Sequence, residues 1–164
     1  MTNADIGLPE FTVRKPIKKK KAIYKKPESL IRLGIEYKQW FYSKKKIPLR
    51  TQVDFKFADN GANALTKAIM AYLSMKGYFA ARINSGATYD KRLGIYRKGS
   101  GATAGMADIN AVINGRSVSI EVKYGKDKIR PSQLKVKAEI EAAGGVFFVA
   151  RTFDGFLDEV EKYF

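Results

Sequence analysis

Two acidic residues and a lysine in the second half of the chain have the types and spacing of a metal-dependent hydrolytic site. Asp108 begins one apolar stretch, and Glu121 and Lys123 end the next one, with Asn-Gly at 114–115 between them. Asn-Gly flanked by alternating apolar residues is the strongest short-range signal for a two-residue β-hairpin loop. The sequence therefore predicts that these two stretches, 107–113 and 117–123, pair as antiparallel strands.

The predicted loop also fixes which residues face each other across the hairpin. Facing residues have numbers that sum to 229, so Asp108 faces Glu121. Alternation along each strand then places one set of side chains on an apolar face (Ile109, Ala111, Ile113, Val118, Ile120, Val122) and another on a polar face (Asp108, Asn110, Ser119, Glu121, Lys123). Facing Cβ atoms lie about 4.5–5.5 Å apart, and like charges there repel. We therefore expect a cation between the two carboxylates.

A divalent ion is the natural cation for this position. Mg²⁺ binds through one or two carboxylates and keeps waters and substrate phosphate oxygens as its other ligands. Lys123 lies one strand period beyond Glu121, where its ammonium group could reach a scissile phosphate or an attacking water. The competing interpretation is a solvated hairpin face on which Lys123 and Glu121 form an exposed ion pair of little energetic weight.

Residue types that are absent narrow the possible chemistry. The chain has no cysteine and no histidine. This excludes disulfides, Cys/His zinc sites, thiol nucleophiles and serine–histidine triads. No apolar run approaches the roughly 18 residues needed to cross a bilayer, and the N-terminus lacks the apolar region of a secretory signal. We therefore expect a soluble, cytoplasmic protein with no membrane partner.

The charge is strongly positive and concentrated near the N-terminus. The net charge is +15, and the first 50 residues hold 14 Lys and Arg against four acidic residues. Cations interleaved with aromatic residues suit phosphate contact and base stacking, so we expect nucleic acid as the partner. A solvated tail or a segment that docks on another protein are the alternatives. The lysines expected to bind nucleic acid are Lys18, Lys19, Lys20, Lys21, Lys25, Lys26, Lys44, Lys45 and Lys46.

The 164 residues divide by pattern into a basic, aromatic-containing extension over 1–60 and an α/β domain over 61–164. Apolar periodicity and turn residues predict a small mixed sheet flanked by helices. The expected elements are an extended arm over 1–28, a helix over 29–43, a helix over 62–76, a strand over 78–83, a Gly-rich mobile loop over 85–105, the hairpin, a helix from Pro131 ended by Gly144, a strand over 146–150 and a helix from about Asp154.

Several short motifs together resemble the PD-(D/E)XK nuclease superfamily, and within it the VRR-NUC branch, which includes phage enzymes resembling Holliday junction resolvases. The resemblance covers residues 62–152. It rests on Gly105-Met106-Ala107-Asp108-Ile109, Ile120-Glu121-Val122-Lys123, Ser132-Gln133, and Gly144-Gly145 before an apolar strand. It implies a restriction-endonuclease-like core of order α-β-β-β-α-β, Mg²⁺-dependent or Mn²⁺-dependent cleavage of branched DNA, and a possible homodimer.

The resemblance also implies residue roles. Asp108 and Glu121 would hold the metal with the backbone carbonyl of Val122. Lys123 would orient or deprotonate the water and offset charge on the phosphorus. Gln133 would position water or phosphate.

Two further residues and one departure bear on the site. Arg82 and Ser85, at the end of the first predicted strand, are candidate DNA contacts, although Arg82 could equally be an ordinary exposed strand residue. The family usually has a glutamate in the first core helix, but 60–76 contains no acid, and Asn63 is the one candidate substitute. The alternative function is therefore a non-catalytic nucleic-acid-binding, phage assembly or packaging protein that keeps the nuclease fold.

Overall fold

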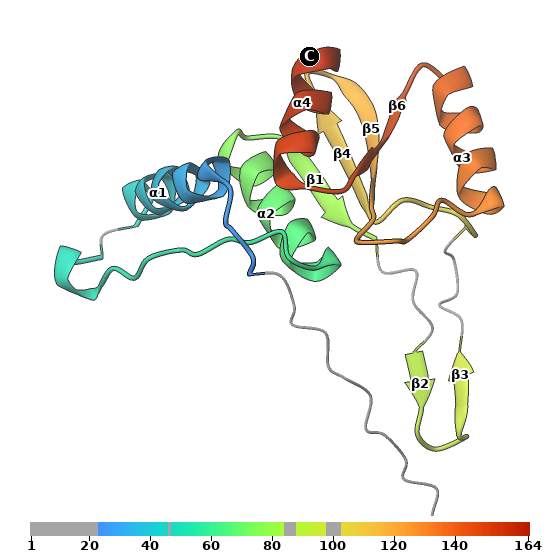
Figure 1. The fold of residues 1–164 in the computed structure, drawn as a ribbon, viewed down its shortest axis with the longest axis horizontal. Coiled ribbons are helices and arrows are strands. Elements are labelled where there is room, and N and C mark those ends of the chain that lie inside the picture. Colours follow the sequence, from blue (N-terminus) through green and yellow to red (C-terminus); the bar gives the residue numbers. More distant parts are fainter. Residues whose placement is uncertain (1–22, 46, 84–87, 98–102) are drawn as a thin grey trace, which may run out of the picture.

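The computed structural model describes residues 23–45, 47–83, 88–97 and 103–164 (Figure 1). None of the helices in these ranges is long and apolar enough to cross a membrane. The elements, in chain order, are α1 (Glu28–Ser43), the short 3₁₀ helix η1 (Leu49–Thr51), α2 (Ala62–Met75), β1 (Phe79–Arg82), β2 (Thr88–Asp90), β3 (Ile95–Arg97), β4 (Ile109–Ile113), β5 (Arg116–Val122), α3 (Pro131–Ala142), β6 (Val146–Ala150) and α4 (Phe153–Tyr163).

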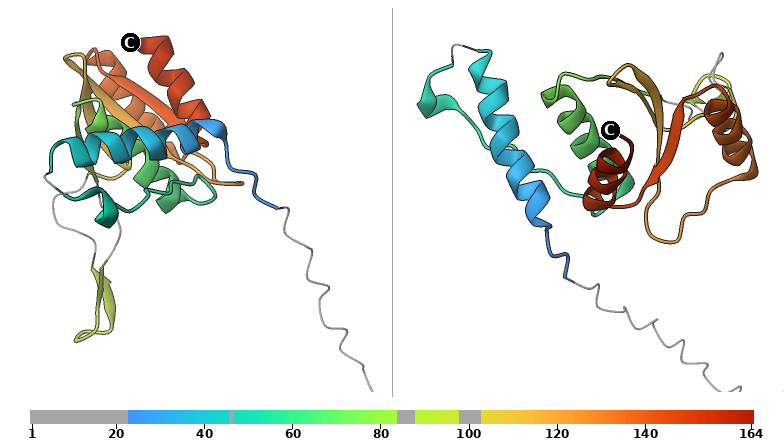
Figure 2. Two further views of the ribbon diagram at one scale, coloured as in Figure 1. Left: turned by 90° about the vertical axis from the view of Figure 1, so that its left-hand side faces the viewer. Right: turned by 90° about the horizontal axis from the view of Figure 1, so that it is seen from above.

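The main sheet has the strand order β1-β4-β5-β6. Strand β4 is antiparallel to both β1 and β5, and β6 is parallel to β5. Helices α2 and α4 cover one face of the sheet, with α1 packed outside them, and α3 covers the other face (Figures 1 and 2). The predicted α/β class, with a small mixed sheet flanked by helices, is confirmed.

The β4–β5 hairpin forms as its turn chemistry requires. Asn114 and Gly115 have φ angles of 47° and 79°. A type I′ turn needs positive φ at both central residues, and Asn-Gly adopts it at little cost. Ile109 pairs with Ile120, and the pairing continues to the residues that flank the turn. The predicted register is therefore confirmed, and it carries residues 108 and 121 to the same end of the sheet.

The core lies between the sheet and α2, α4 and α1. Its centre is the apolar face of β4 and β5, where Ile109, Ile113 and Ile120 are fully buried. Helix α1 adds Leu30 and Leu33 to this same cluster, and Phe57 joins it from the segment that follows. Part of the predicted 1–60 extension therefore shares the core of the α/β domain, while the division of the chain at residue 60 stays a prediction.

Strands β2 and β3 form a separate two-stranded antiparallel sheet, in which Tyr89 pairs with Tyr96. Figure 1 shows this hairpin below the main sheet. The prediction of a loop throughout 85–105 is therefore wrong for 88–97. Aromatic and β-branched residues favour strands here, and Gly94, with φ of 65°, makes the turn. The glycine content of 85–105 predicted a loop and outweighed the strand-favouring residues within it.

Candidate active site

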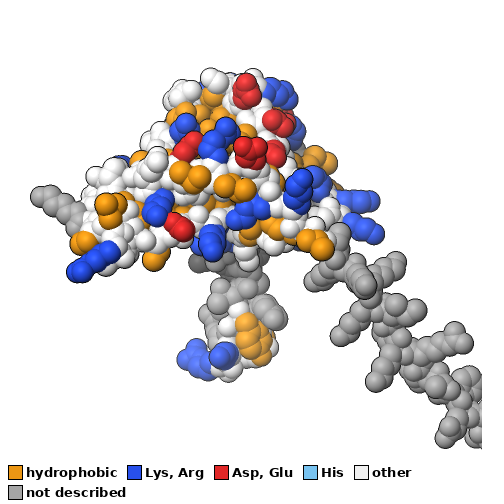
Figure 3. Space-filling view, turned by 60° about the vertical axis from the view of Figure 1, so that its left-hand side comes forward, with side chains coloured by type: hydrophobic (Ala, Val, Ile, Leu, Met, Phe, Trp, Pro, Cys, Tyr) orange, Lys and Arg blue, Asp and Glu red, His pale blue; other side chains and the backbone are white. Residues whose placement is uncertain are grey.

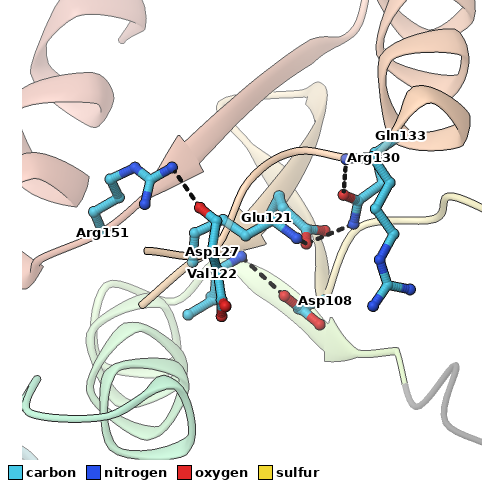
Figure 4. A network of polar contacts seen from close by, with 8 residues as sticks. Asp108, Glu121, Val122, Asp127, Arg130, Gln133 and Arg151 are labelled. Atoms are coloured by element: carbon cyan, nitrogen blue, oxygen red, sulfur yellow. Dashed lines mark hydrogen bonds and ion pairs between the residues drawn. The ribbon is translucent and has the colours of Figure 1, made fainter. Parts of the chain in front are cut away.

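Asp108 is held at the point where the chain enters β4. Its backbone carbonyl accepts a hydrogen bond from the Ile83 N–H at 2.7 Å, which continues the β1–β4 pairing. Its side-chain Oδ2 accepts the backbone N–H of Val122 at 2.9 Å (Figure 4). The carboxylate of Asp108 is therefore fixed against the last residue of β5, beside Glu121.

Glu121 is the most deeply buried acid of the site, with 3% of its surface exposed. Its Oε1 accepts hydrogen bonds from Lys123 Nζ at 2.7 Å and from Gln133 Nε2 at 2.6 Å. Its Oε2 is buried and has no hydrogen-bond partner among the described residues. A buried carboxylate oxygen without a partner is costly, so such an atom requires an explanation such as an ion or a water.

Lys123 and Glu121 do not form the exposed ion pair of the competing interpretation. Their side chains are only 10% and 4% exposed, because α3 covers the polar face of the hairpin. The desolvation free energy of two buried charges is usually about as large as their Coulombic attraction. A buried ion pair therefore contributes little net stability. The burial of this pair therefore favours a chemical role over a solvated surface.

Gln133 links the start of α3 to Glu121. It is the third residue of the helix, and its Oε1 accepts the backbone N–H of Arg130 at 3.0 Å. Its Nε2 donates to Glu121, and the two bonds together fix the orientation of the amide (Figure 4). The described partners of Gln133 are therefore protein groups, and it holds Glu121 in place. Its predicted contact with water or phosphate stays a prediction.

Gly105 allows the chain to pass against the first turn of α3. A Cβ atom at this position would lie 2.3 Å from the carbonyl oxygen of Ser132, and the residue has φ of 95°. Only glycine combines that backbone angle with that approach. The segment that leads into Asp108 and the helix that carries Gln133 are therefore packed directly against each other.

The oxygen donors at this site fit a hard divalent cation. In the ranges that the structure covers, no group of three or more His, Cys, Asp or Glu residues could hold a metal ion. Mg²⁺, however, needs only one or two carboxylates and is satisfied by oxygen ligands. Asp108, the unpartnered Oε2 of Glu121 and the carbonyl of Val122 are the atoms that would hold Mg²⁺ or Mn²⁺.

Arg82 belongs to the other face of the sheet. It pairs with Ile109, whose side chain points into the core, and its Nη2 donates to Asn63 Oδ1 at 2.7 Å. Asn63, the candidate substitute for the missing helix acid, therefore binds an arginine at the start of α2. Ser85 lies outside the described residues, so its predicted DNA contact stays a prediction.

The predicted N-terminal cations fall into two groups. Lys18, Lys19, Lys20, Lys21 and Lys46 lie outside the described residues. Lys25 and Lys26 precede α1, while Lys44 and Lys45 follow it and lie 4.6 Å and 4.0 Å from the ring centres of Trp40 and Phe41. Figure 3 shows cationic side chains spread over this side of the molecule, with apolar side chains between them.

The aromatic residues of α1 pack on one another and on Phe55. The ring of Tyr37 lies 5.1 Å from Trp40 and 4.9 Å from Phe55, and the ring of Phe41 lies 5.0 Å from Phe55. This cluster attaches α1 to the segment after η1. Base stacking on these rings stays a prediction.

Sequence reasoning missed the loop between β5 and α3. Residues 124–130 carry Lys126, Lys128 and Arg130. Arg151 donates hydrogen bonds to the loop carbonyls of Gly125, at 3.5 Å, and Asp127, at 2.9 Å; Figure 4 shows the second of these. The alternation Lys-Xaa-Lys-Xaa-Arg directly after Lys123 was a visible signal. No signal in the sequence indicated the role of Arg151, because it lies 24 residues beyond Asp127.

The candidate site therefore joins three residues of one hairpin to the first turn of the next helix. Asp108, Glu121 and Lys123 meet at the end of β4 and β5, and Gln133 joins them from α3. No family model matches the chain, and no curated protein matches it.

Proposed function

We propose that this protein is a metal-dependent deoxyribonuclease that hydrolyses phosphodiester bonds. The observation that carries the proposal is the buried Glu121 carboxylate beside Asp108. One of its oxygens binds Lys123 and Gln133, and the other has no partner within the part of the chain that the structure describes. A buried carboxylate oxygen without a hydrogen-bond partner destabilises the fold unless a ligand binds it. A cation ligand is the role that suits both carboxylates.

A bound cation and the protein side chains would contribute different parts of the hydrolytic chemistry. When bound, a divalent ion lowers the pKa of its water and stabilises charge on the phosphate. Asp108 and Glu121 supply the negative charge that would hold such an ion. Lys123 keeps a fixed ammonium group at the same end of the sheet, where it would offset charge on the scissile phosphate. Gln133 limits the movement of Glu121 through two hydrogen bonds.

DNA is the substrate class that the charge favours, since a net charge of +15 attracts a polyanion. The resemblance to VRR-NUC enzymes supports branched DNA, such as a four-way junction, as the preferred form. The order α2, β1, β4, β5, α3, β6 agrees with a restriction-endonuclease-like core in which β2 and β3 are an insertion. A homodimer would match the two-fold symmetry of a junction. Sedimentation of the protein with and without junction tests that state.

The activity test uses the full chain with Mg²⁺ and a labelled four-way junction, linear duplex and single strand. We expect paired nicks near the branch, and loss of cleavage by at least about 100-fold in Asp108→Asn and Glu121→Gln, while DNA binding remains. The matched control is Asp158→Asn, which removes an exposed carboxylate from α4. Equal cleavage by the control and the site variants would contradict the proposal.

Metal binding can be measured without cleavage. We expect Mg²⁺ or Mn²⁺ to raise the melting temperature, because the ion binds the assembled carboxylates and not the unfolded chain. Asp108→Asn should remove that increase, and Asp158→Asn should keep it. An increase that survives in Asp108→Asn would place the bound ion elsewhere.

A second candidate function is a nucleic-acid-binding or phage assembly protein without catalysis. It is favoured by the lack of any acid in α2 and by the hydrogen bond that Asn63 makes to Arg82. This function predicts DNA binding with no divalent-dependent cleavage of any of the three substrates. The same set of reactions therefore separates the two candidates.

A further inference from the structure

The loop that joins β5 to α3 combines strong positive charge with a fixed conformation. Lys126, Lys128 and Arg130 are all exposed, and Asp127 is the one acid among residues 124–130. Cationic loops are common on protein surfaces, and most are simply solvated. This loop differs because several contacts hold its backbone in one shape.

Two of the contacts that hold the loop backbone come from the residue that follows β6. Arg151, directly after β6, donates to the carbonyls of Gly125 and Asp127. A turn bond joins the Asp127 N–H to the Tyr124 carbonyl at 3.2 Å, and Gly125 has φ of 59°. Helix α3 fixes the far end, because Gln133 accepts the Arg130 N–H. The loop is therefore anchored at its start, its middle and its end.

The anchored backbone sets the direction of the cations. Residues 127–130 are neither helix nor strand, and in an extended segment side chains alternate from side to side. Ile129 is partly buried, so Lys128 and Arg130 face outward together. Figure 4 shows the guanidinium group of Arg130 extending from the start of α3 to the level of Asp108. The Arg130 cation thus adjoins the candidate metal site, and Lys128 is exposed on the same loop.

We propose that residues 124–130, held by Arg151, bind the sugar–phosphate backbone of DNA next to the scissile bond. The assignment to the scissile bond rests on the proposed nuclease function, whereas the binding itself does not. Phosphate contacts of this kind fix the register and orientation of a nucleic acid without reading its sequence. Arg151 is a positioning residue in this proposal, and Lys128 and Arg130 make the contacts.

The direct test compares two double variants that lose the same charge. Lys128→Gln/Arg130→Gln removes one lysine and one arginine from the loop. Arg116→Gln/Lys162→Gln removes the same pair from the β4–β5 turn and the C-terminal end of α4, at the opposite end of the sheet (Figure 1). Binding of a mixed-sequence 30-base-pair duplex is measured in EDTA, without cleavage, over a range of salt concentrations.

We expect the loop variant to lower the slope of log affinity against log salt by about two, because each lost phosphate contact contributes about 0.9. The control should change the slope by less than half of that. Equal slopes for the two variants would overturn the proposal, since they would mean that only net charge matters.

The role of Arg151 is tested by Arg151→Lys, which keeps the charge but loses the planar fork that reaches two carbonyls. We expect weaker DNA binding with an unchanged melting temperature in the absence of DNA, and Arg116→Lys is the matched control. Wild-type affinity in Arg151→Lys would overturn its positioning role.

The two proposals can fail separately. If Mg²⁺ produces no cleavage but the loop variant still loses its salt slope, the nuclease proposal fails and the phosphate-binding loop stands. If Asp108→Asn abolishes cleavage while the loop variant binds and cleaves as the control does, the loop proposal fails alone.

Discussion

At the scale of single residues, the site depends on how the Glu121 carboxylate is shared. One oxygen binds Lys123 and Gln133, and the other is unpartnered among the described residues. The hydrogen bonds give the side chain one orientation, so its second oxygen is presented in a fixed place. Pre-organisation of this kind is what a metal ligand requires.

The burial of the pair predicts a large effect on stability when only one partner is changed. Glu121→Gln would leave the Lys123 ammonium group buried without a counter-charge, and we expect the free energy of unfolding to fall by about 3–5 kcal/mol. The double variant Glu121→Gln/Lys123→Met removes both charges and should recover more than half of that loss. Urea denaturation of the three proteins measures it. A loss below about 1 kcal/mol in Glu121→Gln would show that the pair is solvated.

Residue types and hairpin register were sufficient to predict that Asp108, Glu121 and Lys123 lie together at one end of the hairpin. They could not predict that Gln133 donates to Glu121, because that contact depends on the angle at which α3 crosses the sheet. The buried state of Lys123 depends on the same crossing. Both features depend on tertiary packing, about which the residue pattern along one strand carries no information.

At the scale of elements, the approach of Gly105 to α3 determines whether the site closes. The side of the sheet that carries the polar residues is covered by a helix, and this helix meets the chain segment that leads into β4. The hairpin, the helix and the segment therefore form one packed unit around the two carboxylates.

Substitution of Gly105 by alanine should disrupt this unit. A Cβ atom would meet the Ser132 carbonyl oxygen at 2.3 Å, so either the segment or α3 must move. Gly77→Ala is a matched control, since Gly77 has φ of 77° and no atom of the described residues lies within 4 Å of its Cβ position. We expect Gly77→Ala to cost about 1–2 kcal/mol from backbone strain alone and Gly105→Ala to cost at least twice as much. Thermal denaturation compares them, and equal losses would contradict the close approach.

Elements with their own turn or cap residues were predictable, and those without were not. The Asn-Gly turn gave the β4–β5 pairing, and Gly77 and Gly144 marked the ends of α2 and α3. The β2–β3 hairpin was not predicted, because its strands are only three residues long and lie among glycines. Short strands carry too little periodicity to outweigh composition.

At the scale of the whole molecule, Asp59 connects the two ends of the described chain. Its Oδ1 accepts the Tyr24 hydroxyl at 2.7 Å, and its Oδ2 accepts the backbone N–H of Phe153 at 3.1 Å. The N-terminal segment is therefore attached to the first turn of α4. Nothing in the local sequence around these residues indicates the pairing, because they are distant along the chain.

The attachment of Tyr24 predicts a dependence of stability on pH. Burial and the hydrogen bond to Asp59 raise the pKa of Tyr24 above its ordinary value of about 10. A raised pKa in the folded state stabilises the protein below pH 10, and this contribution is lost as the pH rises through the folded-state value. We expect Tyr24→Phe to lose about 1 kcal/mol at pH 7 and progressively less relative to wild type above pH 10. Denaturation curves across pH 7–11 measure the difference, and a constant difference would contradict it.

The basic extension predicts a salt effect that belongs to the molecule as a whole. Residues 1–22 contain six Lys and Arg and two acidic residues. A chain that begins at Ile23 keeps the Tyr24 attachment, so we expect it to fold normally and to bind DNA with a smaller slope of log affinity against log salt. Nitrocellulose filter binding in EDTA gives that slope. The same slope in the truncated and full chains would show that these residues do not contact phosphate.

The position of Arg151 also determines when the cationic loop becomes anchored during synthesis of the chain. A ribosome releases β4 and β5 together, and their two-residue turn lets them pair early, whereas the parallel partner β6 must wait for the α3 crossover. Arg151 emerges only after β6, so a nascent chain already carries both carboxylates while its cationic loop is still unanchored. A protein that arises from premature termination within α3 or β6 would therefore keep the acids but lack an anchored loop.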